Sequence, residues 1–217
     1  MGYTAEQIFD MAPVIPVITV DDIKKAVPLA RALVDGGLPV LEITLRTPLG
    51  LEAIRVLKAE VEGAVVGAGT VLNPRDLEGA LAAGSEFIIT PGLTPTLLRA
   101  GCECGVPFMP GIATVSEMMS CLDAGLKALK FFPAEASGGA AILKAFSGPF
   151  PNISFCPTGG IGPGNLASYL AVPTVRTVGG SWMTPAAMVA NEDWHGIRTL
   201  AAEAVALVAS MNSSTER

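Results

Sequence analysis

The sequence predicts a (β/α)8 barrel, in which eight parallel strands close into a ring inside a layer of helices. Eight short apolar runs begin 19 to 26 residues apart, and segments with helical periodicity separate them. Strands that alternate with helices form a parallel sheet, and eight such units at near-constant spacing favour a closed ring. The runs begin at Val14, Leu38, Ala64, Phe87, Val106, Ala128, Ile153 and Thr174.

The expected helices follow in order. An extra helix from Ala5 to Met11, within residues 1–12, precedes the first strand and is expected to cap the bottom of the barrel. Asp22 to Asp35 and Leu49 to Val61 carry apolar residues on one helical face. The last helix is expected from Trp194 to Met211, before a polar tail at residues 212–217. Later helix starts are marked by capping residues or by a first-turn proline at Asn73-Pro74, Thr94-Pro95, Thr114 and Gly162-Pro163. Residues 1–217 are interpreted as a single domain.

An open, doubly wound sheet is the main alternative architecture. It usually carries a glycine-rich nucleotide motif after its first strand, but the first apolar run ends in Asp21-Asp22. The segment Gly67-Ala68-Gly69-Thr70-Val71-Leu72 begins like GxGxxG and has Leu72 in place of the third glycine. We therefore reject a dinucleotide site.

Composition narrows the classes of function. The chain has 217 residues, a net charge of −6, and Lys24-Lys25 as its one adjacent basic pair, so neither nucleic acid nor a membrane is an expected partner. No apolar stretch reaches the ~20 residues of a membrane span, and the N-terminus lacks the basic region of a signal peptide. We expect a cytoplasmic protein. With one histidine and four cysteines, we expect no metal, no cofactor and free thiols.

Lys130 is the principal candidate for catalysis. It lies in the apolar run Ala128-Leu129-Lys130-Phe131-Phe132, where an ammonium loses contact with water. Desolvation disfavours the charged form, and only a neutral amine can attack a carbonyl, so this lysine is a candidate for Schiff-base catalysis. The alternative is a strand-end lysine whose ammonium reaches solvent.

Alternation along the strands brings further polar groups to the same interior. Side chains alternate between the two faces of a strand, so Glu42 and Arg46 in the second run are both expected to point into the barrel. The same alternation turns Lys130 in the sixth run and Thr158 in the seventh inward. Thr70 follows the third run directly. The alternative is a structural ion network, for instance Glu42 with Arg46, but buried charges are costly and packing alone favours apolar residues. Three ionisable groups at the catalytic end of a barrel favour function.

Two glycine-rich loops predict a phosphate site. Thr158-Gly159-Gly160-Ile161 follows the seventh run, and Gly179-Gly180-Ser181-Trp182 follows the eighth. Loops after strands 7 and 8 form the usual phosphate site of such barrels. Neither loop contains a basic residue, so recognition by backbone N–H groups and hydroxyls is expected. Glu135, after the sixth run, is expected to cap a helix rather than to assist catalysis.

Five motifs in this order and spacing resemble the 2-keto-3-deoxy-6-phosphogluconate (KDPG) aldolase family, which includes 4-hydroxy-2-oxoglutarate aldolases. The resemblance extends from about residue 5 to 208. The motifs are Glu42-Ile43-Thr44-Leu45-Arg46-Thr47, Gly67-Ala68-Gly69-Thr70-Val71, Lys130-Phe131-Phe132-Pro133-Ala134-Glu135, Pro157-Thr158-Gly159-Gly160-Ile161 and Gly179-Gly180-Ser181-Trp182.

The resemblance implies a trimeric class I aldolase of the Entner–Doudoroff pathway. Such an enzyme cleaves KDPG, a phosphorylated keto acid, to pyruvate and glyceraldehyde 3-phosphate, and often acts on 4-hydroxy-2-oxoglutarate. By the family's motifs, Lys130 is similar to the Schiff-base lysine and Glu42 to the general acid and base. Arg46, Thr70 and Thr158 correspond to pyruvate contacts. Phosphate contacts are implied for Gly159, Gly160, Gly180 and Ser181.

Three other functions stay open on the sequence. A phosphosugar isomerase or epimerase on the same barrel would use Glu42 as base and Lys130 as an electrostatic partner. A non-catalytic sugar-phosphate binder would retain the loops without turnover. A metal-dependent aldolase would lose its activity in EDTA.

Overall fold

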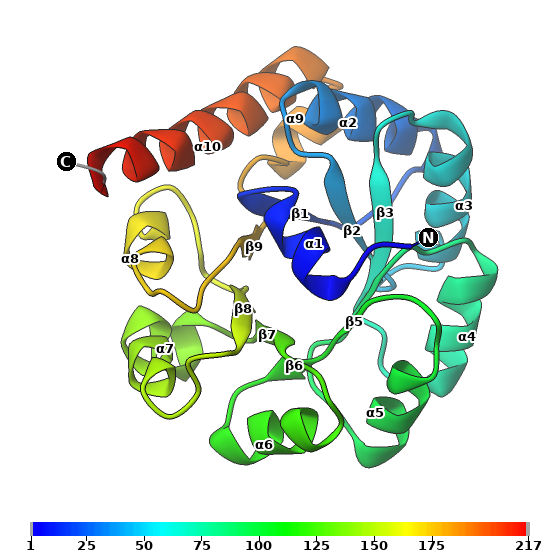
Figure 1. Cartoon of the computed structure of the whole chain (residues 1–217). Coiled ribbons are helices and arrows are strands. Elements are labelled where there is room, and N and C mark those ends of the chain that lie inside the picture. Colours follow the sequence, from blue (N-terminus) through cyan, green and yellow to red (C-terminus); the bar gives the residue numbers. More distant parts are fainter. Residues whose placement is uncertain (1, 216–217) are drawn as a thin grey trace.

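The computed structural model describes residues 2–215, and the side chains of residues 2–211. Nine short strands lie inside a layer of helices, with α1 in front of them in the view of Figure 1. The strands are β1 Val14–Ile18, β2 Val40–Thr44, β3 Val65–Gly69, β4 Ile88–Ile89, β5 Phe108–Met109, β6 Gly111–Ile112, β7 Ala128–Phe131, β8 Ser154–Pro157 and β9 Val178–Gly180.

Helices fill the intervals between the strands, as the apolar periodicity predicts. They are α1 Ala5–Asp10, α2 Ile23–Asp35, α3 Gly50–Glu60, α4 Pro74–Ala82, α5 Pro95–Cys102, α6 Val115–Asp123, α7 Gly139–Ser147, α8 Leu166–Leu170, α9 Ala186–Ala190 and α10 Trp194–Thr215, with a 3₁₀ turn η1 at Glu135–Ser137. Asn73, Thr94 and Thr114 cap α4, α5 and α6 with their side chains, which confirms three of the predicted helix starts.

Two expected helix boundaries were wrong. The helix predicted at Gly162-Pro163 begins only at Leu166, because Asn165 folds back and accepts a hydrogen bond from the Gly162 N–H at 2.9 Å. The last helix continues to Thr215, well into the expected polar tail. Residues 216–217 of that tail, and Met1 of the expected N-terminal segment, lie outside the described residues.

The strands form two curled parallel sheets. Their orders are β5-β4-β3-β2-β1-β9 and β6-β7-β8. The expected α/β fold with a curled parallel sheet is therefore confirmed, but one continuous eight-stranded ladder is not found. The fifth predicted strand is split between β5 and β6 by Pro110, which has no N–H to donate to a neighbouring strand. At the other junction, after β8, two isolated bridges join Phe155 to Val175 and Thr158 to Gly179.

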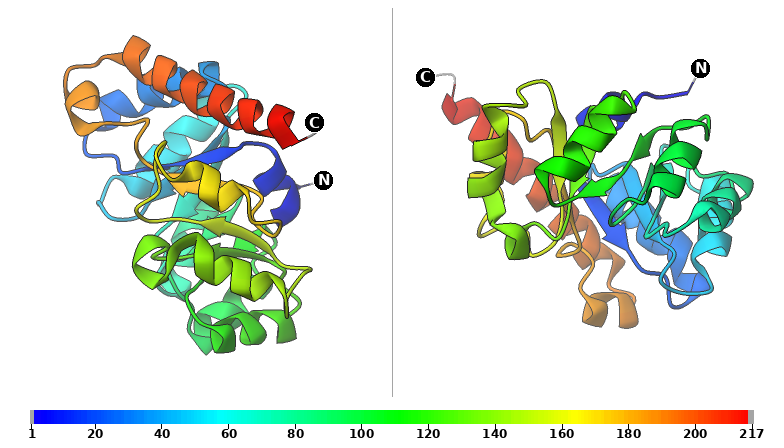
Figure 2. Two further views of the ribbon diagram at one scale, coloured as in Figure 1. Left: turned by 90° about the vertical axis from the view of Figure 1, so that its left-hand side faces the viewer. Right: turned by 90° about the horizontal axis from the view of Figure 1, so that it is seen from below.

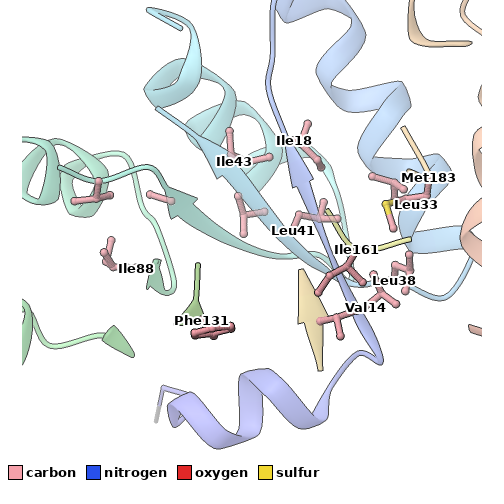
Figure 3. Close-up of a cluster of buried hydrophobic side chains, with 14 of the residues drawn as sticks. Val14, Ile18, Leu33, Leu38, Leu41, Ile43, Ile88, Phe131, Ile161 and Met183 are labelled. Atoms are coloured by element: carbon pink, nitrogen blue, oxygen red, sulfur yellow. The ribbon is translucent and has the colours of Figure 1, made fainter. Parts of the chain in front are cut away.

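Apolar side chains pack on both sides of the strands. Between strands and helices, Ile18, Leu41 and Ile43 belong to a large buried cluster (Figure 3). Inside the curl, Ile15 and Val40 meet Ile8 and Phe9 of α1, which are 0% and 1% exposed. The extra helix therefore closes the interior from below, as expected. Figure 2 shows α1 and the C-terminal end of α10 on one side of the molecule, and α9 on the opposite side.

Over the described residues, no helix combines the length and apolar character needed to cross a membrane. The same part of the chain contains no group of three or more His, Cys, Asp or Glu side chains arranged to hold a metal ion.

Candidate active site

Lys130 and Glu42 form a buried ion pair inside the curl of strands. Lys130 Nζ on β7 lies 3.0 Å from Glu42 Oε1 on β2, and the two side chains are only 5% and 1% exposed. Strand alternation turns both inward, as their parity predicts. The ammonium does not reach solvent, so the snorkelling interpretation is wrong. Because the pair is in direct hydrogen-bond contact, a proton can pass between amine and carboxylate without intervening water.

Gly69 on β3 makes room for the carboxylate. A Cβ atom at this position would lie 2.6 Å from Glu42 Cγ, closer than atoms can approach. In the sequence, this glycine is part of a near-match to a nucleotide motif and of one of the five family motifs, and neither predicts its contact with Glu42. Its role depends on β2 and β3 pairing in register, with Thr44 opposite Gly69, and no local signal reveals that contact.

Arg46 pairs with Thr70 and not with Glu42. Arg46 is exposed, and its Nε donates to Thr70 Oγ1 at 3.2 Å. Among the described residues Arg46 makes no ion pair, so the alternative of a structural Glu42–Arg46 bridge is wrong. Thr70 has φ +57°, a conformation unusual for a β-branched residue. Such strain persists where surrounding structure fixes it, commonly at functional sites.

Cys156 lies beside the ion pair as the strand neighbour of Lys130 in β8. It is 1% exposed, and burial raises the pKa of its thiol to about 12. The thiol is therefore protonated at neutral pH. It contributes an uncharged surface next to Lys130, which keeps the ammonium and carboxylate in a medium of low polarity.

The two glycine loops leave backbone N–H groups open, and the loop after β8 has the left-handed conformation that glycine allows. Gly159 and Gly160 have φ +107° and +78°, which favour glycine. Neither the N–H of Gly160 nor that of Ser181 has an acceptor among the described residues. At Gly180, a side chain would collide with the ring of Trp182. Both loops therefore present backbone donors to the same space.

One cavity of about 740 Å³ is lined by Arg46 and by both glycine loops. Most of the predicted pyruvate and phosphate residues line it: Arg46, Thr158, Gly159, Gly160, Gly180 and Ser181. Lys130, Glu42 and Thr70 do not, but Lys130 Nζ lies 5.5 Å from the ring centre of Phe132, which does. Phe132 received no role in the sequence analysis, although it shares parity with Lys130 and follows it by two residues.

The arrangement matches a known family of enzymes. A family model for KDPG and KHG aldolases matches residues 5–200. The chain is 53% identical over 203 residues to the 2-dehydro-3-deoxy-phosphogluconate aldolase of Dickeya dadantii, covering 94% of this chain and 95% of that protein. It is 52% identical over 202 residues to the KHG/KDPG aldolase of Escherichia coli K12, covering 93% and 95%.

Solved structures agree with the sequence relatives. KDPG aldolase from Legionella pneumophila, with pyruvate captured at low pH as a covalent carbinolamine intermediate, has a TM-score of 0.92 and 44% identity, over 94% of this chain and 98% of that one. The enzyme from Zymomonas mobilis ZM4 with 3-phosphoglycerate has a TM-score of 0.89 and 48% identity, over 94% and 95%.

Proposed function

This chain belongs to the family of KDPG and KHG aldolases, and from that premise we propose how its own residues carry out the reaction. It is a class I aldolase, a carbon–carbon lyase of the Entner–Doudoroff pathway, that cleaves KDPG to pyruvate and glyceraldehyde 3-phosphate. The observation that carries the assignment of roles is the buried Lys130–Glu42 pair at 3.0 Å. We extend the substrate range to 4-hydroxy-2-oxoglutarate.

Lys130 forms the Schiff base. Its neutral amine adds to the C2 carbonyl, and the resulting carbinolamine loses water to give a protonated imine. Glu42 takes the C4 hydroxyl proton while the C3–C4 bonding electrons move toward the imine nitrogen, which releases the aldehyde and leaves an enamine. The proton returns to C3, and water hydrolyses the imine to pyruvate and free Lys130. Proton transfer by a positioned carboxylate is typically worth ~10²–10⁴ in rate.

Arg46, Thr70 and Thr158 bind the pyruvate portion of the substrate. Arg46 uses Nε on Thr70, which leaves its two terminal nitrogens for a bidentate contact with the substrate carboxylate. Thr158 lines the same cavity as Arg46 and the glycine loops. Imine formation requires no metal, so we propose that the enzyme works without a metal or other cofactor. Full activity in EDTA is the expected result, and loss of activity there would support the metal-dependent alternative.

Gly159, Gly160, Gly180 and Ser181 bind the phosphate of the substrate through backbone N–H groups and the serine hydroxyl. Ser181→Ala should raise KM for KDPG about tenfold, since hydrogen bonds to charged groups are worth ~1.5–3 kcal/mol. The KM for unphosphorylated 4-hydroxy-2-oxoglutarate should not change. An equal effect on both substrates would place the phosphate elsewhere.

Trapping of the imine tests the role of Lys130. Incubation with pyruvate and borohydride should attach a reduced pyruvyl adduct to the peptide that carries Lys130, as detected by mass spectrometry. Lys127 is the matched control, because it is exposed and precedes β7 by one residue. An adduct on Lys127, or full activity in Lys130→Ala, would overturn the assignment.

The same experiment separates the alternatives. An isomerase or epimerase would exchange a substrate proton without C–C cleavage and without a trapped adduct. A non-catalytic binder would retain a phosphorylated ligand without turnover. The family relatives named above are aldolases, and neither alternative is favoured.

Three features of the whole protein complete the proposal. The two sheets act as one closed barrel and one domain, which the Thr158–Gly179 bridge and chain continuity at Pro110 support.

The enzyme assembles as a homotrimer, so sedimentation should give three times the chain mass of 22.2 kDa. It works in the cytoplasm, with a keto-acid phosphate and neither nucleic acid nor membrane as partner.

A further inference from the structure

The carbonyl groups of Thr158, Gly159 and Gly160 all accept hydrogen bonds from neighbouring parts of the chain. Thr158 O accepts from the Ala134 N–H at 2.8 Å, and Gly159 O accepts from the Glu135 N–H at 3.1 Å. Gly160 O accepts from Asn165 Nδ2 at 3.0 Å. Because peptide groups are planar, fixing these carbonyl oxygens also fixes the directions of the N–H groups that follow them.

The side chain of Glu135 supports this loop a second time. Its stem lies against Gly160, where a Cβ atom would approach Glu135 Cγ to 2.7 Å. Its carboxylate accepts a hydrogen bond from the Tyr169 hydroxyl. Glu135 therefore does not cap a helix, in contrast to the sequence-based expectation. It links the loop after β8 to α8.

Tyr169 is fixed in position by its buried ring, and its hydroxyl donates the hydrogen bond to Glu135. It is 0% exposed within the apolar core, so its ring cannot move easily. Burial, together with the hydrogen bond and charge of Glu135, raises the pKa of its phenol, which stays protonated and donates to the carboxylate. The Glu135 carboxylate is bonded to Tyr169, whereas Lys130 is paired with Glu42, so we treat Glu135 as a positioning residue.

We propose that Glu135 and Tyr169 form a positioning pair that keeps the Gly159–Gly160 loop ready for phosphate and so sets the preference for phosphorylated substrates. The inference rests on the phosphate site proposed above. Without the tyrosine hydroxyl, the Glu135 stem loses its restraint on Gly160.

Kinetics on two substrates test the pair. Tyr169→Phe keeps the ring and removes the hydrogen bond, so KM for KDPG should rise about three- to tenfold. The kcat for KDPG and both constants for 4-hydroxy-2-oxoglutarate should stay within about twofold, because that substrate lacks the phosphate. Glu135→Gln retains an oxygen that accepts from Tyr169 and should behave like the unchanged enzyme. Glu135→Ala, a change at an exposed residue, should repeat the Tyr169→Phe result.

The outcomes are distinguishable. The positioning pair would be overturned if Tyr169→Phe impaired the kinetics on both substrates equally. It would also be overturned if KM for KDPG stayed unchanged in Tyr169→Phe or in Glu135→Ala. Ser181→Ala, measured in parallel, decides the phosphate site separately. If it discriminates between the substrates while Tyr169→Phe does not, the phosphate site stands and the pair is wrong. If neither variant discriminates, both proposals are wrong.

Discussion

Gly69 matters to the reaction because of the side chain that it lacks. A methyl group there would overlap Glu42, whose carboxylate is only 3.0 Å from Lys130. Glu42 would have to move to relieve this overlap, and its carboxylate would then lose its contact with the amine. We expect Gly69→Ala to fold and to lower kcat about 10²-fold, the lower end of what a positioned acid and base contributes.

Steady-state kinetics and circular dichroism check this expectation. Gly148→Ala is the matched control. An added Cβ atom there would lie 3.7 Å from its nearest neighbour, which is an ordinary contact, and Gly148 does not line the cavity. The control should retain full activity. If Gly69→Ala also retained full kcat, Glu42 would not need its observed position.

Cys156 makes the stability of the protein sensitive to alkaline pH. Its thiol is protonated in both folded and unfolded chains below pH 9, so its contribution to stability is intact there. Burial raises its pKa from 9.0 to about 12 in the folded state. As the pH rises through this interval, only the unfolded chain ionises, and the free energy of unfolding falls. The loss at pH 10 is on the order of 1 kcal/mol for this thiol.

Urea unfolding at pH 8 and pH 10 measures this effect. The comparison is between the parent chain and Cys156→Ala, so that only the contribution of this thiol differs. The difference in unfolding free energy between the two pH values should be smaller in the variant by on the order of 1 kcal/mol. Identical pH dependence in both chains would mean that the thiol titrates alike in folded and unfolded states.

Among the elements, α1 has the clearest structural task. It is a short helix of six residues, too short to be stable by itself. A capping box between Thr4 and Gln7 starts it, and Ile8 and Phe9 seal the interior of the curled sheets from below. Its stability therefore comes from packing, and the barrel interior depends on it in return.

Phe9→Ala should accordingly destabilise the protein by about 3–5 kcal/mol, the usual cost of removing a buried aromatic ring. Asp10→Asn is the control on the same helix. It weakens an exposed pair with Arg176 at 2.7 Å, and such pairs are worth at most about 1 kcal/mol. Denaturant midpoints distinguish the two. A small effect of Phe9→Ala would indicate that α1 detaches without disturbing the interior.

For the molecule as a whole, the features that the sequence predicts are those that repeat locally along the chain, namely the strands, the helices and the inward alternation of side chains. Apolar runs predict the strands, and inward parity predicts that Lys130 and Glu42 face the same interior. The ring of hydrogen bonds was overpredicted, because the Pro110 break looks like an ordinary apolar strand in sequence. Gly69 beneath Glu42 and Tyr169 on Glu135 were missed, since such contacts depend on strand register and helix packing rather than on spacing.

The division into two sheets raises a question about cooperativity that hydrogen exchange can answer. If the proposed closed barrel is one domain, amides in β2 and β3 should open with the same free energy as those in β7 and β8, equal to that of global unfolding. Circular dichroism and the fluorescence of Trp182 and Trp194 should then give coincident transitions at a fixed protein concentration. Two distinct opening free energies, one for each sheet, would show that the isolated Thr158–Gly179 bridge and the chain at Pro110 do not join them into one unit. We expect a single value, because apolar side chains from both sheets, among them Val40 and Ala128, share the cluster that α1 closes.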